Sequence, residues 1–285
     1  MFKRLVLSAA FVCCSTWAAA VPSLESPRAL VLDASTGEVL LAKGEHDVAS
    51  IASLTKLMTA MVVLDAGLNP YEVLDIEPAD QDAIKGTKSG VPVGARFTRR
   101  TLLRLALLAS DNRAAAALAR TYPGGMPAFV RAVAAKAQAL GLQETSMREP
   151  TGLSPKNQSS AADVARMLAA AAHYPEITDI TSQRMAQFDV NGVSTQFHNT
   201  NRMVGSPGWK ILLSKTGYTR EAGLCLSMLL EEAGRKVLVV VMGAGDRADR
   251  ASDVIAIKRW LSGRELLGPR AASKLALGAT APARQ

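Results

Sequence analysis

The chain has 285 residues, of which 48% are hydrophobic and 5% aromatic, and its formal net charge is +8 at pH 7. No dense run of Lys and Arg with interleaved aromatic residues occurs, so the composition argues against a nucleic-acid-binding protein. The length suits one large domain or two small ones, and the mild basic excess suits an anionic polymer as partner.

Residues 1–20 have the features of a secretory signal peptide. Lys3 and Arg4 supply the positive start, a short apolar stretch follows, and the alanines at 18–20 provide a small-residue cleavage site. The apolar stretch is too short to span a membrane. We therefore expect cleavage after the third alanine, and the valine before Cys13 makes a lipoprotein signal the weaker interpretation.

The remaining chain divides into a domain over 21–262 and a tail over 263–285. Cys225 is the one cysteine left after cleavage, so no internal disulfide is expected, and its apolar surroundings predict a buried, unreactive thiol. No later apolar run reaches about 18 residues, so no transmembrane helix is expected. The tail is rich in Ala, Pro and Arg and is expected to be loosely ordered, and a short amphipathic anchor near 271–277 would bind membranes weakly.

Apolar patterning in the first half predicts a hairpin followed by a block of helices. The stretch "RALVLDASTGEVLLA" is typical of two strands around a turn at 35–37. Asp111 opens an alanine-rich helix, Gly141 is a C-cap, and Ser160 with Asp163 forms a variant capping box. The expected elements are the hairpin 28–42 and helices at 52–66, 101–110, 111–121, 127–140 and 161–172.

Strands dominate the second half. They are expected at about 209–216, 223–230 and 236–242, and an amphipathic helix follows at about 249–262. The order is two strands, a block of helices, three strands and one helix. This order predicts an α+β fold, in which an antiparallel sheet made by early and late strands is flanked by helices and carries an inserted helical region.

The apolar stretch "IASLTKLMTAM" carries a serine and a lysine three positions apart. Ser53 and Lys56 would lie on one face of a helix. In one interpretation Ser53 is a helix N-cap and Lys56 is solvated; in the other, Ser53 is a nucleophile and Lys56 its base. A serine three residues before a lysine is expected about once by chance in such a chain, so this pair alone decides nothing.

Two further motifs decide between the interpretations. Ser110-Asp111-Asn112 lies at a helix-to-helix junction, and Lys215-Thr216-Gly217 lies at the end of a strand. The three patterns Ser-x-x-Lys, Ser-x-Asn and Lys-Thr-Gly each occur once, in this order. Together they are the signature of penicillin-recognising serine enzymes.

The chemistry explains why these residue types occur together. A serine hydroxyl needs a base within hydrogen-bond reach, and Lys56 can be that base only when neutral. An ordinary lysine has a pKa of about 10.4, which burial and a second cation such as Lys215 would lower. Ser110 could relay a proton between either lysine and the leaving amine, and Asn112 could hold Lys56 or a substrate amide.

The strand motif provides the remaining groups. Gly217 would let a substrate backbone lie against the strand edge, as in strand addition. The backbone N–H groups of Ser53 and Tyr218 would form an oxyanion hole. His46, His173 and His198 show no metal-binding spacing and are expected to be structural, so no metal site is predicted.

Longer stretches extend the resemblance beyond the three motifs. The chain resembles the low-molecular-mass penicillin-binding proteins of the D-alanyl-D-alanine peptidase family over about residues 25–262, and within them the short endopeptidases of the periplasm. The stretches that carry it are "RALVLDASTGEVLLAK", "IASLTKLMTAMVVLDAG", "LRLALLASDNRAAAALA", "EPTGLSPKN", "HNTNRMV" and "LSKTGYTREAG".

The resemblance implies a periplasmic enzyme that cuts cross-links of peptidoglycan through an acyl-serine intermediate. It implies no metal or organic cofactor and implies inhibition by β-lactam antibiotics. Carried over, the roles are nucleophile for Ser53, base for Lys56, relay for Ser110, substrate holding for Asn112, and carboxylate recognition for Lys215 and Thr216. The longer carboxypeptidases of the family carry an extra β-rich domain and a membrane anchor, for which the stretch after Gly217 leaves no room here.

Three alternatives to the endopeptidase remain. The first is a D-alanyl-D-alanine carboxypeptidase. The second is a β-lactamase, which needs a deacylating glutamate with an asparagine one turn later; the nearest acid is Glu149, and Leu153 stands four residues on. The third is a non-catalytic wall-binding protein, which would be marked by a broken motif, and none of the three motifs is broken.

Overall fold

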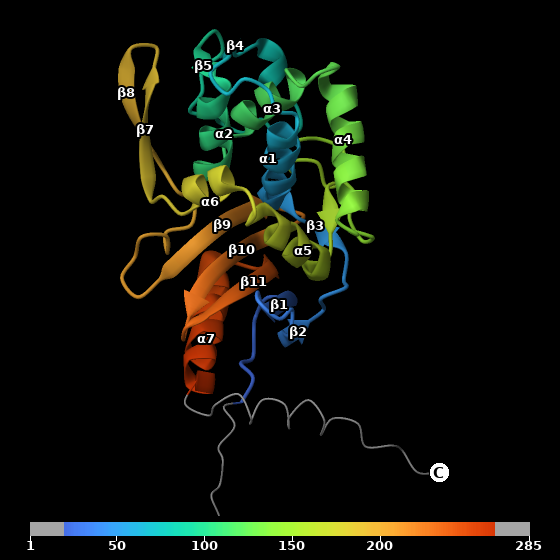
Figure 1. The fold of residues 1–285 in the computed structure, drawn as a ribbon, viewed down its shortest axis with the longest axis vertical. Helices are drawn as coiled ribbons and strands as arrows, with labels where there is room; N and C mark the ends of the chain where they lie inside the picture. Colours follow the sequence, from blue (N-terminus) through green and yellow to red (C-terminus); the bar gives the residue numbers. More distant parts are fainter. Residues whose placement is uncertain (1–19, 266–285) are drawn as a thin grey trace, which may run out of the picture.

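The computed structural model describes residues 20–265, so the expected signal peptide and most of the expected tail lie outside it. Its centre is a five-stranded antiparallel sheet in the order β2-β1-β11-β10-β9 (Figure 1). The predicted meeting of early and late strands is confirmed, because β1 pairs with both β2 and β11. The strands are β1 (Arg28–Asp33), β2 (Val39–Lys43), β9 (Lys210–Thr219), β10 (Gly223–Glu232) and β11 (Arg235–Ala244).

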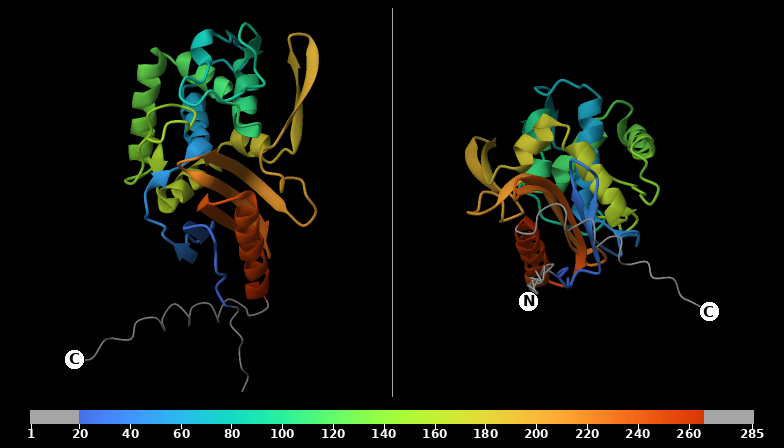
Figure 2. Two further views of the ribbon diagram at one scale, coloured as in Figure 1. Left: turned by 180° about the vertical axis from the view of Figure 1, so that it is seen from behind. Right: turned by 60° about the horizontal axis from the view of Figure 1, so that its bottom comes forward.

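The sheet separates two apolar cores. Along β11, Leu238 and Val240 belong to the core shared with the main block of helices, whereas Val239 and Val241 pack in the core shared with α7 (Arg247–Glu265). Side chains alternate between the two faces of a strand, so a strand covered on both sides is apolar at every position. The run "KVLVVVM" therefore marks a central strand with helices on both faces (Figure 2).

The helices expected from apolar periodicity are all present with small shifts of their ends. Asp111 and Ser160 cap their helices as predicted: Asp111 accepts a hydrogen bond from the N–H of Ala114 at 2.9 Å, and Ser160 accepts one from the N–H of Asp163 at 3.1 Å. The reciprocal bond of the predicted capping box is not among the described hydrogen bonds, because the Asp163 carboxylate binds the N–H of Glu144 and the Thr145 hydroxyl instead. These helices are α1 (Thr55–Asp65), α2 (Arg99–Leu108), α3 (Asn112–Arg120), α4 (Gly125–Ala139) and α5 (Ala161–Ala171).

Several smaller elements escaped prediction. Helix α6 (Pro175–Thr181) precedes a hairpin of β7 (Met185–Val190) and β8 (Val193–His198), which projects from the helical region in Figure 1. The other missed elements are η1 (Ala52–Leu54), η2 (Pro78–Asp80) and the short strand pairs β3 (Ala49–Ser50) with β6 (Gln158–Ser159) and β4 (Val73–Asp75) with β5 (Arg96–Thr98).

The last helix, expected at about 249–262, extends past its predicted end. Helix α7 continues through Glu265, because Trp260 and Leu261 are buried against the sheet and hold its last turns in place. A glycine inside a helix costs only about 1 kcal/mol, which does not end a helix anchored in this way.

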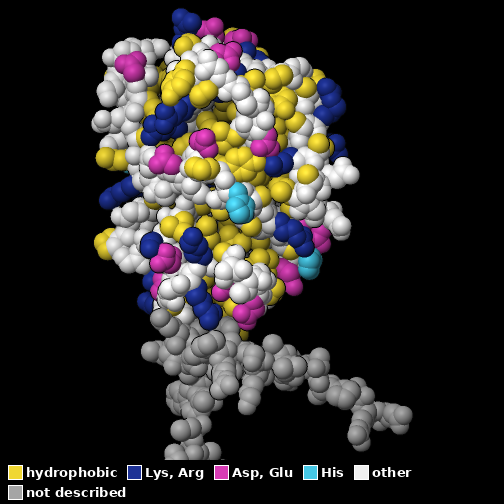
Figure 3. Space-filling view, in the orientation of Figure 1, with side chains coloured by type: hydrophobic (Ala, Val, Ile, Leu, Met, Phe, Trp, Pro, Cys, Tyr) yellow, Lys and Arg dark blue, Asp and Glu magenta, His cyan; other side chains and the backbone are white. Residues whose placement is uncertain are grey.

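No helix within residues 20–265 is long and apolar enough to span a membrane. On the face seen in Figure 3, Lys and Arg side chains are interspersed with Asp and Glu side chains rather than gathered in one basic strip. The positive charge on that face is therefore distributed among carboxylates.

Candidate active site

Ser53 and Lys56 lie one helical turn apart where η1 runs directly into α1. Lys56 Nζ lies 2.9 Å from Ser53 Oγ, and only 1% of the lysine is exposed. The structure contradicts the simpler interpretation of this pair, because Ser53 forms no side-chain cap at either helix start and Lys56 is not solvated. In the structure the Ser-x-x-Lys motif therefore forms a buried contact between a hydroxyl and an amine.

Two further oxygen atoms fix the Lys56 amine. Its Nζ donates to Asn112 Oδ1 at 2.6 Å and to the backbone carbonyl of Thr151 at 2.8 Å. Neither oxygen carries a hydrogen, so both need a donor. A neutral amine has two N–H groups and one lone pair. With both N–H groups used, the lone pair of neutral Lys56 faces the Ser53 hydroxyl, which is the geometry that a base requires.

Burial favours the neutral form of this amine. Desolvation lowers the pKa of Lys56 to about 8, although the negative charges of Glu149, Asp111 and Asp82 oppose the shift. Burial also lowers the pKa of Lys215 well below its usual value, and the charge of Lys56 lowers it further. Two buried ammonium groups repel each other, so a charge on one of the two lysines favours the neutral form of the other.

Ser110, two residues before Asn112, contacts Lys215 of β9. Lys215 Nζ donates to Ser110 Oγ at 2.8 Å and to the carbonyl of Thr216 at 3.1 Å. Ser110 joins α2 to α3 with a left-handed backbone (φ +58°). Among the described hydrogen bonds none joins Ser110 to Lys56, so of the two expected lysine partners the structure brings it to Lys215.

Strand β9 forms the edge of the sheet that borders Ser53, and β10 is its one neighbour in the sheet. Gly217 lies against η1: a Cβ there would stand 2.9 Å from the Ile51 carbonyl oxygen and 3.1 Å from the Ser53 backbone nitrogen. Thr216 donates a hydrogen bond to the Thr200 hydroxyl at 2.6 Å, and Tyr218 is exposed. The absence of a side chain at Gly217 is what allows the strand to approach Ser53.

The loop 149–152 packs against the residue before Ser53 and contacts Lys56. The sequence pattern predicted no such role for this loop. The Glu149 carboxylate accepts the N–H groups of Thr151 and Gly152, both at 2.7 Å. Gly152 has φ +84°, and a Cβ there would lie 1.8 Å from the carbonyl oxygen of Ala52. The loop therefore presses on the residue before Ser53 and presents the Thr151 carbonyl to Lys56.

A second network supports the Asn112 side of Lys56. The Asn112 amide donates to Thr87 Oγ1 at 2.9 Å, and the Thr87 hydroxyl donates to the Asp82 carboxylate at 2.7 Å. Asp82 also accepts the N–H groups of its own loop, including that of Lys85 at 3.0 Å. This chain of bonds fixes the orientation of the Asn112 amide, so that its oxygen faces Lys56.

The cleft beside Ser53 has a volume of about 650 Å³. It contains three guanidinium groups, those of Arg202, Arg247 and Arg250, and no Asp or Glu side chain lines it. Arg250 is half-buried, and its Nε has no hydrogen-bond partner. Sequence reasoning missed these arginines. The lining residues are Ser53, Ser110, 198–203, Thr216, Gly217, Tyr218, Leu224, Arg247, Arg250 and Ala251.

His198, which was expected to be structural, is exposed at the wall of this cleft. Cys225 is fully buried as predicted, and burial raises the pKa of its thiol to about 11. Within residues 20–265, no group of three or more His, Cys, Asp and Glu side chains is arranged to hold a metal ion.

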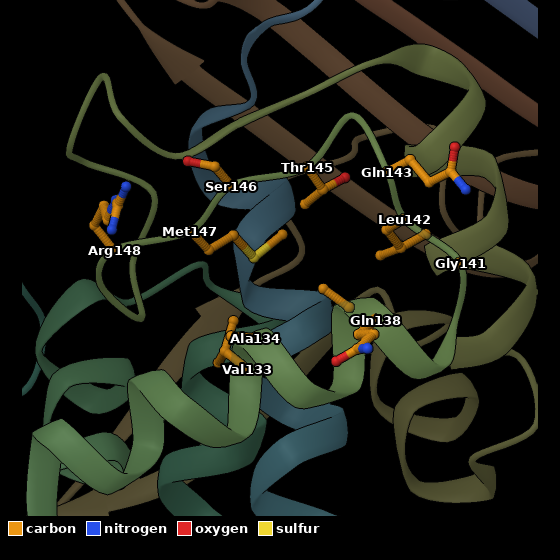
Figure 4. Close-up of a pocket in the computed structure, with 11 residues that line it drawn as sticks. Val133, Ala134, Gln138, Gly141, Leu142, Gln143, Thr145, Ser146, Met147 and Arg148 are labelled. Carbon is orange, nitrogen blue, oxygen red and sulfur yellow. The ribbon is translucent and has the colours of Figure 1, made fainter.

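A cavity of about 460 Å³ lies between α4 and the segment 141–148 (Figure 4). Apolar side chains such as Val133, Leu142 and Met147 line much of it, together with the amides of Gln138 and Gln143. No carboxylate and no histidine is among the lining residues. It lacks a nucleophile paired with a base, so the chemistry of the molecule is placed in the Ser53 cleft.

Comparison with known proteins adds independent findings. The model of the D-alanyl-D-alanine carboxypeptidase family matches residues 15–246. A D-alanyl-D-alanine endopeptidase of Pseudomonas aeruginosa is 43% identical over 253 residues, covering 88% of this chain and 82% of that protein. The D-alanyl-D-alanine endopeptidase of Escherichia coli is 40% identical over 257 residues, covering 89% and 83%. The crystal structure of a Streptomyces DD-transpeptidase has a TM-score of 0.79 at 25% identity and covers 85% of this chain and 98% of that one.

Proposed function

The chain belongs to the D-alanyl-D-alanine carboxypeptidase family and is a serine D-alanyl-D-alanine peptidase, and from that premise we propose that it is an endopeptidase of peptidoglycan cross-links. The observation that carries the chemistry is the buried Lys56 amine, whose two N–H groups are taken by Asn112 and Thr151 while its third position faces Ser53. The endopeptidase activity is supported by the names of its relatives in Pseudomonas and Escherichia.

The reaction begins with the transfer of the Ser53 proton to neutral Lys56. Ser53 Oγ then bonds to the carbonyl carbon of a donor D-alanine, and the backbone N–H groups of Ser53 and Tyr218 bind the oxygen on which negative charge develops. The amide C–N bond breaks, and the leaving nitrogen receives a proton through Ser110 from Lys215. Water then attacks the acyl carbon and gives one proton through Ser110 to neutral Lys215, the bond between the acyl carbon and Ser53 Oγ breaks, and Lys56 returns its proton to Ser53.

Substrate binding uses the edge of β9 and the cations of the cleft. The donor peptide adds as a strand along Thr216, Gly217 and Tyr218. Lys215, Thr216 and Arg250 bind the carboxylate beside the scissile amide. Thr216 and Arg250 line the cleft with Ser53, Lys215 directly precedes Thr216 in β9, and Arg250 has no acidic partner among the described residues. Asn112 holds Lys56 and the substrate amide.

Penicillin would acylate Ser53 and remain bound. The β-lactamase alternative needs a free glutamate that activates water near Ser53. Glu149 instead accepts hydrogen bonds from three backbone N–H groups and the Thr151 hydroxyl of its own loop, so its carboxylate is fully occupied. Glu149 is therefore not free to act as the deacylating carboxylate.

Residues 1–20 would direct the protein to the periplasm, where peptidoglycan is its substrate. In the same proposal residues 21–262 form the catalytic domain. N-terminal sequencing of the exported protein tests the first point: a mature terminus at Val21 supports it, and an uncleaved or cytoplasmic chain contradicts it.

The endopeptidase assignment is tested by liquid chromatography of two purified muropeptides at equal concentration. One is a cross-linked dimer and the other a monomeric pentapeptide. Splitting of the dimer at a higher rate than release of D-alanine from the pentapeptide is expected. The reverse order would make the enzyme a carboxypeptidase, an assignment that the family description favours. Lys215→Ala should reduce both rates by about a hundredfold while the melting temperature stays measurable as a single transition.

A further inference from the structure

The Ser53 cleft contains more positive charge than one carboxylate requires. Arg202, Arg247 and Arg250 all line it, and none of the three forms an ion pair within the described part of the chain. The acids at the start of α7, Asp246 and Asp249, do not line the cleft, and Asp246 accepts the N–H of Asp249 instead. Three uncompensated guanidinium groups beside a nucleophile indicate an anionic ligand with more than one negative group.

The three arginines differ in depth. Arg250 is half-buried, and its Nη1 donates to the carbonyl of Cys225 at 3.4 Å. Cys225 pairs with Gly217 in the sheet, which places the Arg250 head close to the strand position opposite Ser53. Arg202 and Arg247 are exposed, and they therefore line the outer part of the same cleft.

We propose that Arg202 and Arg247 form a subsite for a second carboxylate on the leaving peptide, separate from the carboxylate beside the scissile amide. This inference rests on the proposed endopeptidase function. Arg202 comes from the segment after β8 and Arg247 from the first residue of α7, so the subsite joins two elements that are distant in sequence. Burial lowers the pKa of Arg250 and the charge of Arg247 lowers it further, as expected for two guanidinium groups that line one cleft.

The subsite explains how one active site could distinguish its two candidate substrates. A terminal D-alanine leaves with a single carboxylate, which the inner cations bind. A cross-linked stem leaves with a diamino acid and further carboxylates beyond the first one. Only the second kind of leaving group contacts the outer arginines, so they stabilise its transition state selectively.

The test uses two synthetic substrates with the same acyl donor ending in D-alanine. In one the leaving group is D-alanine; in the other it is 2,6-diaminopimelate, which carries a second carboxylate. For the double variant Arg202→Gln/Arg247→Gln, kcat/KM should fall about tenfold or more with the dicarboxylate leaving group. With the D-alanine leaving group it should change less than about twofold, within the usual scatter for surface substitutions.

A matched control removes two charges elsewhere. Arg235→Gln/Arg259→Gln changes two exposed arginines outside the cleft lining and should leave both rates unchanged. The benzylpenicillin acylation rate of each variant shows whether the site remains folded. Equal losses on both substrates, or no loss on either, would overturn the subsite. The endopeptidase assignment is decided separately, by the wild-type preference between dimer and pentapeptide, so each proposal can fail alone.

Discussion

The two walls of the Ser53 cleft are built differently. On the helical wall, Lys56, Asn112 and Glu149 have hydrogen-bond partners within the protein. On the sheet wall, β9 has a free edge, and Arg250 keeps a buried nitrogen without a partner. The first wall fixes Lys56 and Asn112, the groups proposed to handle protons, through bonds within the protein. The second presents an open strand edge and arginines without acidic partners among the described residues, and we expect these to bind the substrate.

Removing the nucleophile gives the largest expected effect on the helical wall. Ser53→Ala should abolish the adduct that benzylpenicillin forms with the wild type, as measured by intact mass and peptide mapping. Its melting temperature should stay close to that of the wild type, because loss of one hydroxyl rarely destabilises a fold strongly. An adduct that persists on another serine, such as Ser110, would contradict the assignment of the nucleophile.

The base gives the next largest effect. Lys56→Arg should acylate about a hundredfold or more slowly, since a guanidinium does not give up its proton at these pH values. The control is Lys88→Arg, an exposed lysine of the helical region without a described partner, which should be unaffected. Near-normal acylation of the Lys56 variant would mean that another group is the base.

The pH dependence follows from the pKa of Lys56, which burial lowers to about 8. Below that pH the amine is protonated and cannot accept the Ser53 proton, so the acylation rate should fall as the pH decreases. Above it the rate should reach a plateau. Because Lys56 and Lys215 titrate together, the midpoint belongs to the pair. A profile that rises only near the ordinary lysine pKa would show that the amine is not desolvated during the reaction.

Two glycine substitutions compare the walls directly. Gly152→Ala introduces a Cβ 1.8 Å from the Ala52 carbonyl oxygen at a left-handed position. It should destabilise the protein by about 2 to 4 kcal/mol. Gly217→Ala meets the Ile51 oxygen at 2.9 Å without an unfavourable φ. It should therefore cost less stability yet still slow acylation.

Urea unfolding gives the free energy of each glycine variant, and benzylpenicillin acylation gives its activity. Gly234→Ala serves as the control, because it has a similar left-handed φ of +71° but meets nothing within 4 Å. If Gly217→Ala were the more destabilising of the two active-site variants, the sheet wall would be the more tightly packed one. Such a result would contradict the expectation that the helical wall is the more tightly packed of the two.

Local sequence spacing predicted the contact between Ser53 and Lys56, although the proposed role of the pair needed the other two motifs. The two side chains meet because they are one turn apart where η1 runs into α1. The preference of Ser110 for Lys215 depends on how the α2–α3 junction meets β9, and the spacing left that open. Thr151 binds Lys56 through its backbone carbonyl, and a backbone carbonyl is present at every residue, so no residue type predicts this contact. The stretch "EPTGLSPKN" around it contributes only to the family resemblance.

The helices and strands were likewise predictable where a local pattern marks them, and were missed where they depend on contacts between distant residues. Long apolar runs predicted the central strands, because burial on both faces imposes an apolar residue at each position. The β7–β8 hairpin was missed although Asn191 and Gly192 form a common hairpin turn, with φ +53° and +83°. The short pairing of β3 with β6 joins residues far apart in sequence, and two residues carry no periodicity. The cleft arginines were missed because exposed arginines are common and only the fold brings them together.

The smallest expected effect concerns an exposed ion pair that joins the two walls. Lys85, from the loop that supports Asn112, lies 2.7 Å from Glu221 in the turn between β9 and β10. Hydrogen bonding to Lys85 lowers the pKa of Glu221 to about 2, so this carboxylate stays charged over the whole range in which acylation is measured. Exposed pairs of this kind contribute little to stability and are screened by salt.

Lys85→Ala should therefore leave the melting temperature within error of the wild type and change kcat/KM for the cross-linked dimer by less than about fivefold. High salt should reproduce that change in the wild type and have no further effect on the variant. Lys88→Ala, a neighbouring exposed lysine without a described partner, controls for the loss of charge. A large loss of acylation in Lys85→Ala alone would show that the pair positions Asn112 through its loop, and that the helical wall depends on the sheet wall for its geometry.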